Sequence, residues 1–464
     1  MSLGSRFYRQ KGRVTMDENE LMGSMKVSKA VAKMAIPSVI SSLVTVVYNM
    51  ADTFFVGQTG DPLQVAAVSL TNPIFILFMA FANMFGMGGS AAASMALGEK
   101  KEKRVKQVSS FITYASLIVG IVFAAILLVG MQPVLQLFGA DADTYELAKG
   151  YTTYISYGAP FIIWSAAASF VVRADGASRE AMTGSMIGTV ANIILDPIFI
   201  SGFGMGAAGA AIATTIGNIM ASVYYLWYFC RKSRNMSMAF RYFKCGDRIL
   251  SQVCSAGLPT AIFSALMSIS TIILNQILVA YGNAPVAAIG IVFKANMFIT
   301  FLQMGLANGV QPLLGYSYGA GNRERFIAVE RYTKKCCLIV GVLATALFFF
   351  FREPIIRLFI SDTEVINYGV EMLIAYMISG PVIGILFMNM NCMQSTGNAL
   401  PATILSILRQ GVLLIPVLYG LNALLGLHGV IYGQALTDYV IDYLKTDTGF
   451  SKLLYKYLLM NDQI

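Results

Sequence analysis

Two acidic residues interrupt otherwise apolar stretches in the first half of the chain, Asp52 in YNMADTFFVG and Asp196 in ANIILDPIFI. An ionisable side chain at membrane depth costs roughly 2.5–3.5 kcal/mol on insertion scales, so each one needs a compensating role. Asn192 lies four residues before Asp196, so a helix places both side chains on one face. Carboxylates gathered by burial predict a site that binds Na⁺ or exchanges protons, and the sequence does not choose between these ions.

Neighbouring residues extend this candidate cation site. Pro197 has no backbone N–H, so it frees a carbonyl group one turn earlier, near Ile193, as an additional acceptor. Thr214, in GAAIATTIG, supplies a hydroxyl group that completes the set. Tyr48 lies one turn before Asp52 and is expected to line a substrate cavity. We expect a transient Na⁺ at most, and no permanently bound metal.

The segments that carry these residues are predicted to be transmembrane helices of an all-α integral membrane protein. The chain has 464 residues and only 12% of them are charged, against roughly 25% in soluble domains, so a soluble fold is excluded. Apolar stretches of about 18 or more residues recur without the alternation of barrel strands, which predicts about twelve spans. The predicted spans are 35–57, 65–90, 108–130, 147–172, 182–201, 207–229, 256–281, 286–312, 334–351, 367–393, 401–425 and 429–444.

Basic residues concentrate in alternate connections between these spans. Clusters fall within 100–106, 231–248 and 323–335, whereas 57–64 has no Lys or Arg. Cytoplasmic loops carry the excess of Lys and Arg, so both termini are expected in the cytoplasm and the chain in the inner or plasma membrane. The net charge of +9 is explained by these clusters, and we expect no nucleic-acid partner.

An internal repeat emerges when the second half of the chain is compared with the first. Pro37 meets Pro259 at a shift of 222 residues, and Gly98 meets Gly319 at a shift of 221. One register held across several helices indicates a duplication. Six spans per half is an even number, so the repeats are parallel. Further pairs at the shift of 221 are Asp141 with Asp362, Pro160 with Pro381 and Gly176 with Gly397.

The duplication predicts two lobes with a central substrate cavity between them. Each lobe can bury its own helices, so a monomer in contact with membrane lipids is expected. The predicted organisation is a cytoplasmic N-terminus (1–33), an N-lobe (34–230), a cytoplasmic linker (231–254), a C-lobe (255–445) and a cytoplasmic tail (446–464).

The repeat also tests the candidate cation site. The equivalents of its four residues in the second half are all apolar. A slip of one residue would place Asn275 opposite Asp52, but no acid appears in either register, so duplication alone does not explain the acids. The alternative interpretation is that Asp52 is solvated near a helix end and Asp196 pairs locally. The equivalent pairs are Asp52 with Leu274, Asn192 with Leu413, Asp196 with Val417 and Thr214 with Ala435.

The second half contains its own charged candidates. Lys294 and Arg409 lie in apolar segments without a clear acidic partner in their own lobe, and both are candidate cavity-lining residues. Arg409 is expected to extend its charge to the membrane surface. Lys294 either lines the cavity or pairs with Asp438. His428, the single histidine, is expected at a surface or interface.

No sequence signature of an enzyme or an ATP-driven pump is present. The chain has no GxxxxGK[ST] nucleotide-binding loop, no zincin helix and no nucleophile elbow. We therefore expect a protein that is not an enzyme and that needs no cofactor beyond a coupling ion, H⁺ or Na⁺.

Several segments resemble the multidrug and toxic compound extrusion (MATE) family over nearly the whole chain. They are YNMADTFFVGQTG, NIILDPIFI, GAAGAAIATTIGN and LRQGVLLIPVLYGLNALLGLHGVIYG. The resemblance implies the DinF-like branch, in which Asp52, Asn192, Asp196 and Thr214 match the N-lobe cation-site residues. The last span departs from the family pattern, because it is short and carries Asp438 and Asp442.

The resemblance implies secondary active efflux of amphipathic, mostly cationic drugs, driven by H⁺ or Na⁺ and operating by alternating access. A lipid-linked-precursor flippase of the same superfamily is the alternative, and its cavity should carry several cationic residues. A membrane-embedded enzyme is a third class, which would need a nucleophile or metal constellation that the sequence lacks.

Overall fold

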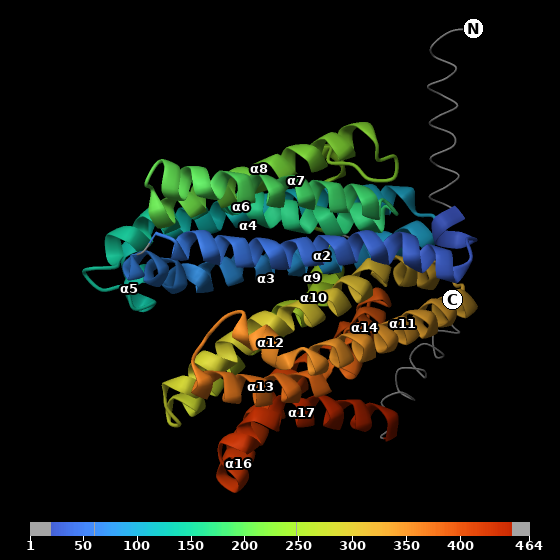
Figure 1. The fold of residues 1–464 in the computed structure, drawn as a ribbon. Helices are drawn as coiled ribbons and strands as arrows, with labels where there is room; N and C mark the ends of the chain where they lie inside the picture. The colour runs from blue at the N-terminus through green and yellow to red at the C-terminus, as the bar shows by residue number, and fades with distance from the viewer. Residues whose placement is uncertain (1–19, 60, 247, 448–464) are drawn as a thin grey trace. The chain divides into compact units, whose positions relative to one another are not determined.

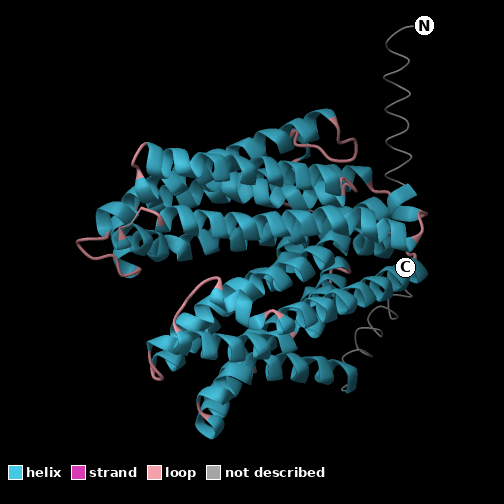
Figure 2. Cartoon of the chain, viewed as in Figure 1, coloured by secondary structure: helices cyan, strands magenta, loops and turns pink. Residues whose placement is uncertain are grey.

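A computed structural model describes residues 20–59, 61–246 and 248–447, and this part of the chain consists of helices and connecting loops, without strands (Figure 2). Ten described helices are long and apolar enough to cross a membrane. An eleventh span is formed by two helices that meet at an angle of 45°. The chain is therefore a multi-pass membrane protein. The predicted tail 446–464 and N-terminus 1–33 fall largely outside the described residues.

The first repeat forms six long helices and a short one (Figure 1). Several helices extend beyond the predicted spans, since α2 begins at Val27 and α3 ends at Gly98. Asp61 caps the start of α3, where its carboxylate accepts from the Leu63 N–H at 2.9 Å. The helices are α2 (Val27–Gly57), α3 (Pro62–Gly98), α4 (Glu102–Val129), α5 (Met131–Leu137), α6 (Tyr145–Ala174), α7 (Ser178–Pro197) with a π-helical turn (Ile198–Gly202), and α8 (Gly206–Arg231).

The second repeat has the same order of helices with two interruptions. The predicted span 367–393 bends between α13 and α14, at Gly380 and Pro381. The predicted span 401–425 contains a π-helical turn, Leu408–Val412. The helices are α9 (Ile249–Val279), α10 (Asn283–Gly319), α11 (Arg323–Phe350), α12 (Arg352–Arg357), α13 (Thr363–Ile378), α14 (Gly380–Ser395), α15 (Ala399–Ile407), α16 (Leu414–Leu425) and α17 (Leu427–Asp447).

The last predicted span, 429–444, forms α17, a helix of 21 residues. It is not among the ten helices that are apolar enough to span by composition. Asp438 and Asp442 account for this difference, because each acid lowers the hydropathy of the segment. Within the described residues, ten or eleven spans pass by length and composition, and α17 is the further helix at the position of the twelfth predicted span.

The equivalence of the repeats extends to helix caps. Asp141 Oδ1 accepts from the Thr144 N–H at 2.9 Å just before α6. Its partner in the repeat, Asp362, accepts from the Glu364 and Val365 N–H groups at the start of α13. A side chain that satisfies free backbone N–H groups stabilises the start of a helix. These two acids are thus structural and do not belong to an ion site.

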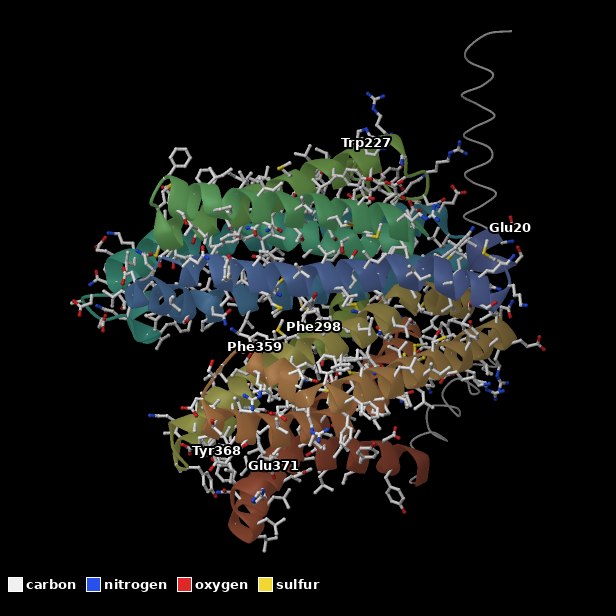
Figure 3. The ribbon with its side chains drawn as sticks, in the orientation of Figure 1. Glu20, Trp227, Phe298, Phe359, Tyr368 and Glu371 are labelled. Atoms are coloured by element: carbon white, nitrogen blue, oxygen red, sulfur yellow. The ribbon has the colours of Figure 1, made fainter. Side chains whose placement is uncertain are left out.

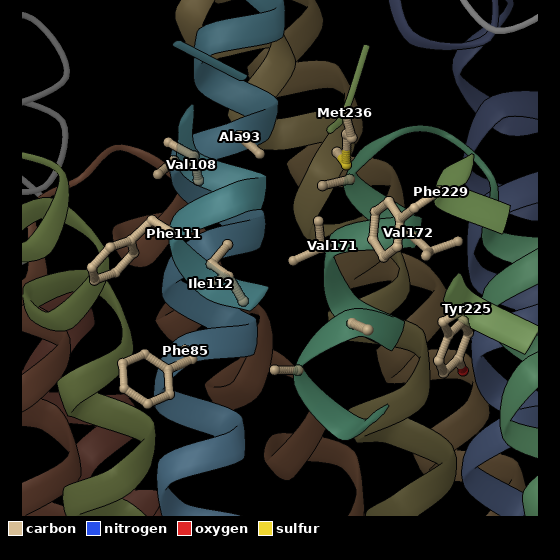
Figure 4. Packing of buried hydrophobic residues seen from close by; sticks show 14 of the residues in the cluster. Phe85, Ala93, Val108, Phe111, Ile112, Val171, Val172, Tyr225, Phe229 and Met236 are labelled. Carbon is tan, nitrogen blue, oxygen red and sulfur yellow. The ribbon is translucent and has the colours of Figure 1, made fainter. Parts of the chain in front are cut away.

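Among the described residues, those within 20–261, 309–329 and 394–397 form one compact unit, and the others form a second unit. In the first unit α6 lies centrally and packs against α3, α4 and α8, while α2 packs against α7. Figure 4 shows side chains of four helices meeting in its core. Labelled members include Phe85 and Ala93 of α3, Phe111 and Ile112 of α4, Val171 and Val172 of α6, and Tyr225 and Phe229 of α8.

The outer face of this unit is apolar. On α4, Ile118, Ile121 and Ile126 are more than half exposed. Trp227 of α8 is labelled at the edge of the helices in Figure 3 and is 45% exposed. Such a surface is unfavourable in water and is the surface that lipid chains cover in a membrane.

Glycines allow α3 to contact the start of α9 and the end of α10 within the first unit. A Cβ atom added at Gly257 would lie 1.9 Å from the Met84 carbonyl oxygen. One added at Gly319 would lie 2.1 Å from the Met95 carbonyl oxygen. Small residues permit such close backbone approach between membrane helices.

This contact leads to a stability prediction for Gly257→Ala. The new methyl group meets backbone atoms, so α3 and α9 must separate, at a cost of about 1–3 kcal/mol. Thermal unfolding of the detergent-solubilised protein measures this loss. Gly290→Ala is the matched control, since a Cβ atom there has no neighbour within 4 Å. Equal melting temperatures for both variants would contradict the close contact.

The connection between the repeats folds against the first unit. The buried Asp175 carboxylate accepts from Tyr228 (2.8 Å), Ser233 (2.6 Å) and Asn235 (3.0 Å). Burial raises the pKa of the Asp175 carboxyl, and these three hydrogen bonds oppose the rise. The Ser109 hydroxyl also donates to the Ser237 carbonyl at 3.0 Å.

Loss of the hydrogen bonds to the Asp175 carboxylate should expose the connection between the repeats to proteases. Asp175→Ala removes the acceptor for three donors, so we expect tryptic cleavage at Lys232 to accelerate by about tenfold, which corresponds to about 1.4 kcal/mol. The rate of cleavage in detergent, followed by gel, measures this change. Asp141→Ala serves as the control, and a rate equal to that of the control would contradict the anchoring role.

Candidate functional site

Three helices of the first unit bring the predicted cation-site residues together. Asp52 is near the end of α2, Asn192 and Asp196 occupy one face of α7, and Thr214 lies on α8. Because α7 packs against both α2 and α8, these helices bring the four residues to one region of the unit, where Asp52 is half-buried. Asp196 is fully buried, and Asn192 and Thr214 are only 3% and 5% exposed.

A hydrogen-bond network joins α7 to α8. The surrounding groups set the orientation of the Asn192 amide. Its nitrogen donates to Asp196 Oδ2 at 3.1 Å, and its oxygen accepts from the Thr214 hydroxyl at 3.2 Å. Asn218, also on α8, donates to the Thr214 carbonyl at 2.9 Å. The amide therefore aligns one oxygen of Asp196 and leaves the other to a different partner.

The second oxygen of Asp196 is the distinctive feature of the site. Oδ1 is buried and accepts no hydrogen bond from the described residues. A buried carboxylate oxygen without a partner is costly, unless it carries a proton or lies against a cation. Asp52, on the neighbouring helix α2, supplies a second acid in the same region of the unit. Two interacting acids favour binding of a proton or a cation over full ionisation of both.

The backbone near Asp196 departs from a regular helix. Pro197 ends α7, and residues Ile198–Gly202 continue as a π-helix. The Phe203 N–H donates to the Ile198 carbonyl at 2.9 Å in this turn. π-Helical turns occur frequently at functional sites, where they change the direction of side chains and carbonyl groups. The proline thus precedes a local change in backbone geometry, and the free carbonyl group near Ile193 stays a prediction.

Two tyrosines contribute to the site. Tyr48 of α2, predicted to line a cavity, has its hydroxyl 3.4 Å from the Thr214 hydroxyl. Tyr151 of α6 packs against the buried cluster of Val56, Ile200 and Ala210, next to the ends of α2 and α7, and sequence reasoning missed it. A tyrosine in an apolar span carries no pattern that separates such a role from ordinary packing.

The described residues contain no group of three or more His, Cys, Asp or Glu side chains suited to a metal ion. The oxygens available here are instead those of two carboxylates, an amide, a hydroxyl group and the backbone. This set suits a weakly held monovalent cation or a proton.

The MatE family model matches residues 37–198 and 259–419. The chain belongs to the MatE family. The two matched segments begin at Pro37 and Pro259, which are the residues that open the internal repeat. The family assignment therefore agrees with the duplication predicted from the sequence.

Curated relatives of this MatE chain carry the name multidrug export protein MepA. The protein from Staphylococcus saprophyticus is 33% identical over 412 residues, which cover 89% of this chain and 91% of the relative. The protein from Staphylococcus aureus is 32% identical with the same coverage of both chains.

Solved structures support the MATE fold. A MATE protein crystallised with the compound MaD3S is 25% identical, with a TM-score of 0.90 over 96% of this chain and 99% of that one. An outward-facing multidrug resistance MATE family transporter is 25% identical, with a TM-score of 0.87 over 95% and 98%. A MOP superfamily transporter from Pyrococcus furiosus, noted for the reverse polarity of its binding pocket, is 26% identical, with a TM-score of 0.88 over 94% and 97%.

The charged residues of the second repeat of this MatE protein correct one expectation. Arg409 does not reach toward the membrane surface, and it has an acidic partner in its own lobe. Its guanidinium is buried and binds Asp438, with Nε and Oδ1 separated by 2.7 Å. Asp438 is therefore paired with Arg409 and not with Lys294, which is exposed.

His428 lies at the surface, as predicted. Its side chain is 73% exposed, and Nδ1 is 2.5 Å from Glu371 Oε1. Glu371 is labelled on α13 in Figure 3. An exposed pair of this kind contributes little to stability. It belongs to the second unit, whereas the four cation-site residues belong to the first.

Proposed function

We propose that this protein exports amphipathic, predominantly cationic drugs by secondary active antiport. Inward movement of H⁺ or Na⁺ through the site formed by Asp52, Asn192, Asp196 and Thr214 drives the cycle. The observation that carries this proposal is the buried Asp196 carboxylate, whose Oδ1 has no hydrogen-bond partner among the described residues. The names of the MepA relatives support drug export as the transported process.

The proposed mechanism depends on a difference in affinity between two orientations of the transporter. The coupling ion stabilises the orientation in which Asp196 and Asp52 are neutralised, and the drug stabilises the other orientation. An ion that binds both orientations with equal affinity would not shift the equilibrium between them. The π-helical turn after Pro197 is the local element that changes with ion occupancy, since it directly follows Asp196.

The proposed cellular setting follows from the charge pattern. The basic clusters at 100–106, 231–248 and 323–335 support cytoplasmic termini and a location in the inner or plasma membrane. The protein is proposed to act as a monomer surrounded by lipid, without nucleic-acid partners, cofactors or catalytic activity. The DinF-like branch fits the placement of the acids in the first repeat.

A flippase for lipid-linked precursors is the competing function. Such a cavity needs free cationic residues that bind a phosphate headgroup. Asp438 neutralises Arg409, so of the two cations predicted for the cavity only Lys294 remains available. The structure therefore favours drug export over headgroup binding.

Efflux of ethidium from cells that lack their own drug pumps tests the proposed function. We expect efflux that collapses when either the H⁺ or the Na⁺ gradient is dissipated, and the gradient that matters identifies the coupling ion. Efflux that persists after both gradients are removed would contradict ion coupling. Absence of efflux with a well-expressed protein would favour the flippase.

A further inference from the structure

A buried ion pair lies in the second unit, far along the chain from the proposed coupling site. Arg409 belongs to the π-helical turn Leu408–Val412, and Asp438 belongs to α17. Their side chains are 5% and 0% exposed, and Arg409 Nε donates to Asp438 Oδ1 at 2.7 Å. Gln434, one turn earlier on α17, donates to the same oxygen at 3.3 Å. The carboxylate is thus fixed and has a cation as its main partner.

Two aromatic rings complete the surroundings of the guanidinium. Its central carbon lies 5.5 Å from the centre of the Phe263 ring and 5.6 Å from that of Phe387. The two rings meet edge to face, with their centres 5.9 Å apart. Aromatic faces next to a carboxylate attract cations, and planar cations most strongly. The arrangement therefore has the chemistry of a binding site for a planar organic cation.

Arg409 fills this site incompletely. The second contact of the guanidinium, from Nη2 to Asp438 Oδ2, is long at 3.4 Å. Nη1 is buried and has no hydrogen-bond partner among the described residues. An arginine whose role is only structural is expected to bind its carboxylate partner through two short hydrogen bonds. Its remaining N–H groups are expected to have acceptors as well. The fit leaves one donor unsatisfied, so a different planar cation could occupy the site at least as well.

The other repeat shows that the fold does not require this ion pair. In the repeat register, Arg409 corresponds to Gly188 and Asp438 to Gly217, both at the shift of 221. These glycines bring the backbones of α7 and α8 together: a Cβ atom at Gly217 would lie 2.6 Å from the Gly188 carbonyl oxygen. In the first repeat, α7 and α8 thus cross with their backbones in contact. At the equivalent crossing in the second repeat, a charge pair lies next to two aromatic rings.

We propose that Asp438, Phe263 and Phe387 form a second binding site, specific for planar organic cations, which Arg409 occupies as a built-in competitor. The site lies within the second unit and is separate from the ion site formed by Asp52 and Asp196. The identity of the cargo rests on the proposed function, whereas the existence of the site does not. Before the exchange the Asp438 carboxylate is paired with Arg409. After a cargo cation displaces Arg409, the carboxylate is paired with the cargo cation instead.

Chemical rescue of Arg409→Ala tests the site in the full-length, detergent-solubilised protein. Truncation leaves the Asp438 carboxylate buried without its cation, so the melting temperature falls. Millimolar guanidinium chloride should restore at least half of the loss, because the free cation occupies the vacated position. Sodium chloride and tetramethylammonium chloride at equal ionic strength should restore none of it. No greater restoration by guanidinium than by sodium would overturn the proposal.

Two further variants separate this result from general effects of salt and from the proposed transport function. Arg357→Ala removes an exposed arginine of the same unit, paired with Glu353 at 2.8 Å, and should not respond to guanidinium. A guanidinium response in Arg357→Ala equal to that of Arg409→Ala would overturn the proposal. Asp196→Asn combined with Arg409→Ala should keep the rescue, even when drug export is lost.

A second measurement applies if Arg409→Ala does not fold. The double variant Arg409→Leu/Asp438→Leu replaces both charges with apolar side chains and avoids a lone buried charge. We expect its affinity for ethidium, measured by fluorescence on the purified protein, to fall by at least about tenfold. Binding of ethidium with wild-type affinity and stoichiometry would overturn the proposal.

Discussion

Asp196→Asn is expected to abolish gradient-driven efflux of ethidium while the protein still reaches the membrane. The amide has nearly the same size as the carboxyl group, so the packing of α7 against α8 is retained. It cannot take up a proton or neutralise a cation, so the difference in ion affinity between the two orientations disappears. A coupling free energy of about 1–3 kcal/mol corresponds to a change of about 5- to 150-fold in binding affinity, and without it gradient-driven efflux should fall to the background rate. Fluorescence of preloaded cells measures this rate.

Asp141→Asn is the matched control for this prediction. Asp141 is also an aspartate of the first repeat, but its carboxylate caps the start of α6 through Thr144. Its substitution weakens a helix cap and leaves the ion site intact, so efflux should stay near the wild-type rate. Unchanged efflux in Asp196→Asn, with Asp141→Asn also unchanged, would remove Asp196 from the mechanism.

Arg409→Leu should destabilise the protein by about 3–5 kcal/mol, because the partner carboxylate of Asp438 is fully buried and loses its counter-charge. The double variant Arg409→Leu/Asp438→Leu should recover most of this loss, since no buried charge remains. The expected interaction between the two substitutions is therefore large and favourable. Thermal and denaturant unfolding of the four proteins of the cycle measure it.

The exposed pair of Arg357 and Glu353 provides the comparison, because both side chains are more than half exposed. Loss of that pair should cost at most about 1 kcal/mol. A double variant of Arg409 and Asp438 that is as unstable as Arg409→Leu alone would show that the destabilisation comes from lost packing and not from the unpaired carboxylate.

The sequence predicted the helices for physical reasons, and the cation-site role of the four candidate residues stays a prediction. Membrane spans need long apolar segments, and an acid within such a segment is rare enough to be noticed. Asp196 and Asn192 share a helix face, which the spacing of four residues dictates. Thr214 and Asp52 lie on other helices, but the first repeat holds few additional polar groups at membrane depth. The short list of candidates made the grouping predictable.

The ion pair of the second repeat was not predictable in the same way. Arg409 and Asp438 lie on different helices, and no periodicity relates residues on separate helices. The π-helical turn at Leu408–Val412 also alters the direction in which Arg409 points, and an ideal helix would not place it there. Asp438 could equally have paired with Lys294 on sequence grounds.

The break between α13 and α14 was missed because the same proline has different effects in the two repeats. Pro160 lies inside the continuous helix α6, whereas the equivalent Pro381 follows Gly380 at a bend of 45°. A glycine next to a proline combines low helix propensity with a missing hydrogen bond, so this helix divides. The residue next to the proline therefore determines whether the helix divides. A comparison of the two repeats that aligns only the prolines does not consider this residue.

Equilibrium binding of ethidium to the purified protein at varied pH and Na⁺ concentration is the most direct test of ion coupling at Asp196. If H⁺ or Na⁺ and the drug favour opposite orientations, raising the coupling ion must weaken ethidium binding in the wild type. The account predicts that this dependence on the ion disappears in Asp196→Asn, while ethidium still binds. An equal dependence on the ion in wild type and Asp196→Asn would contradict it.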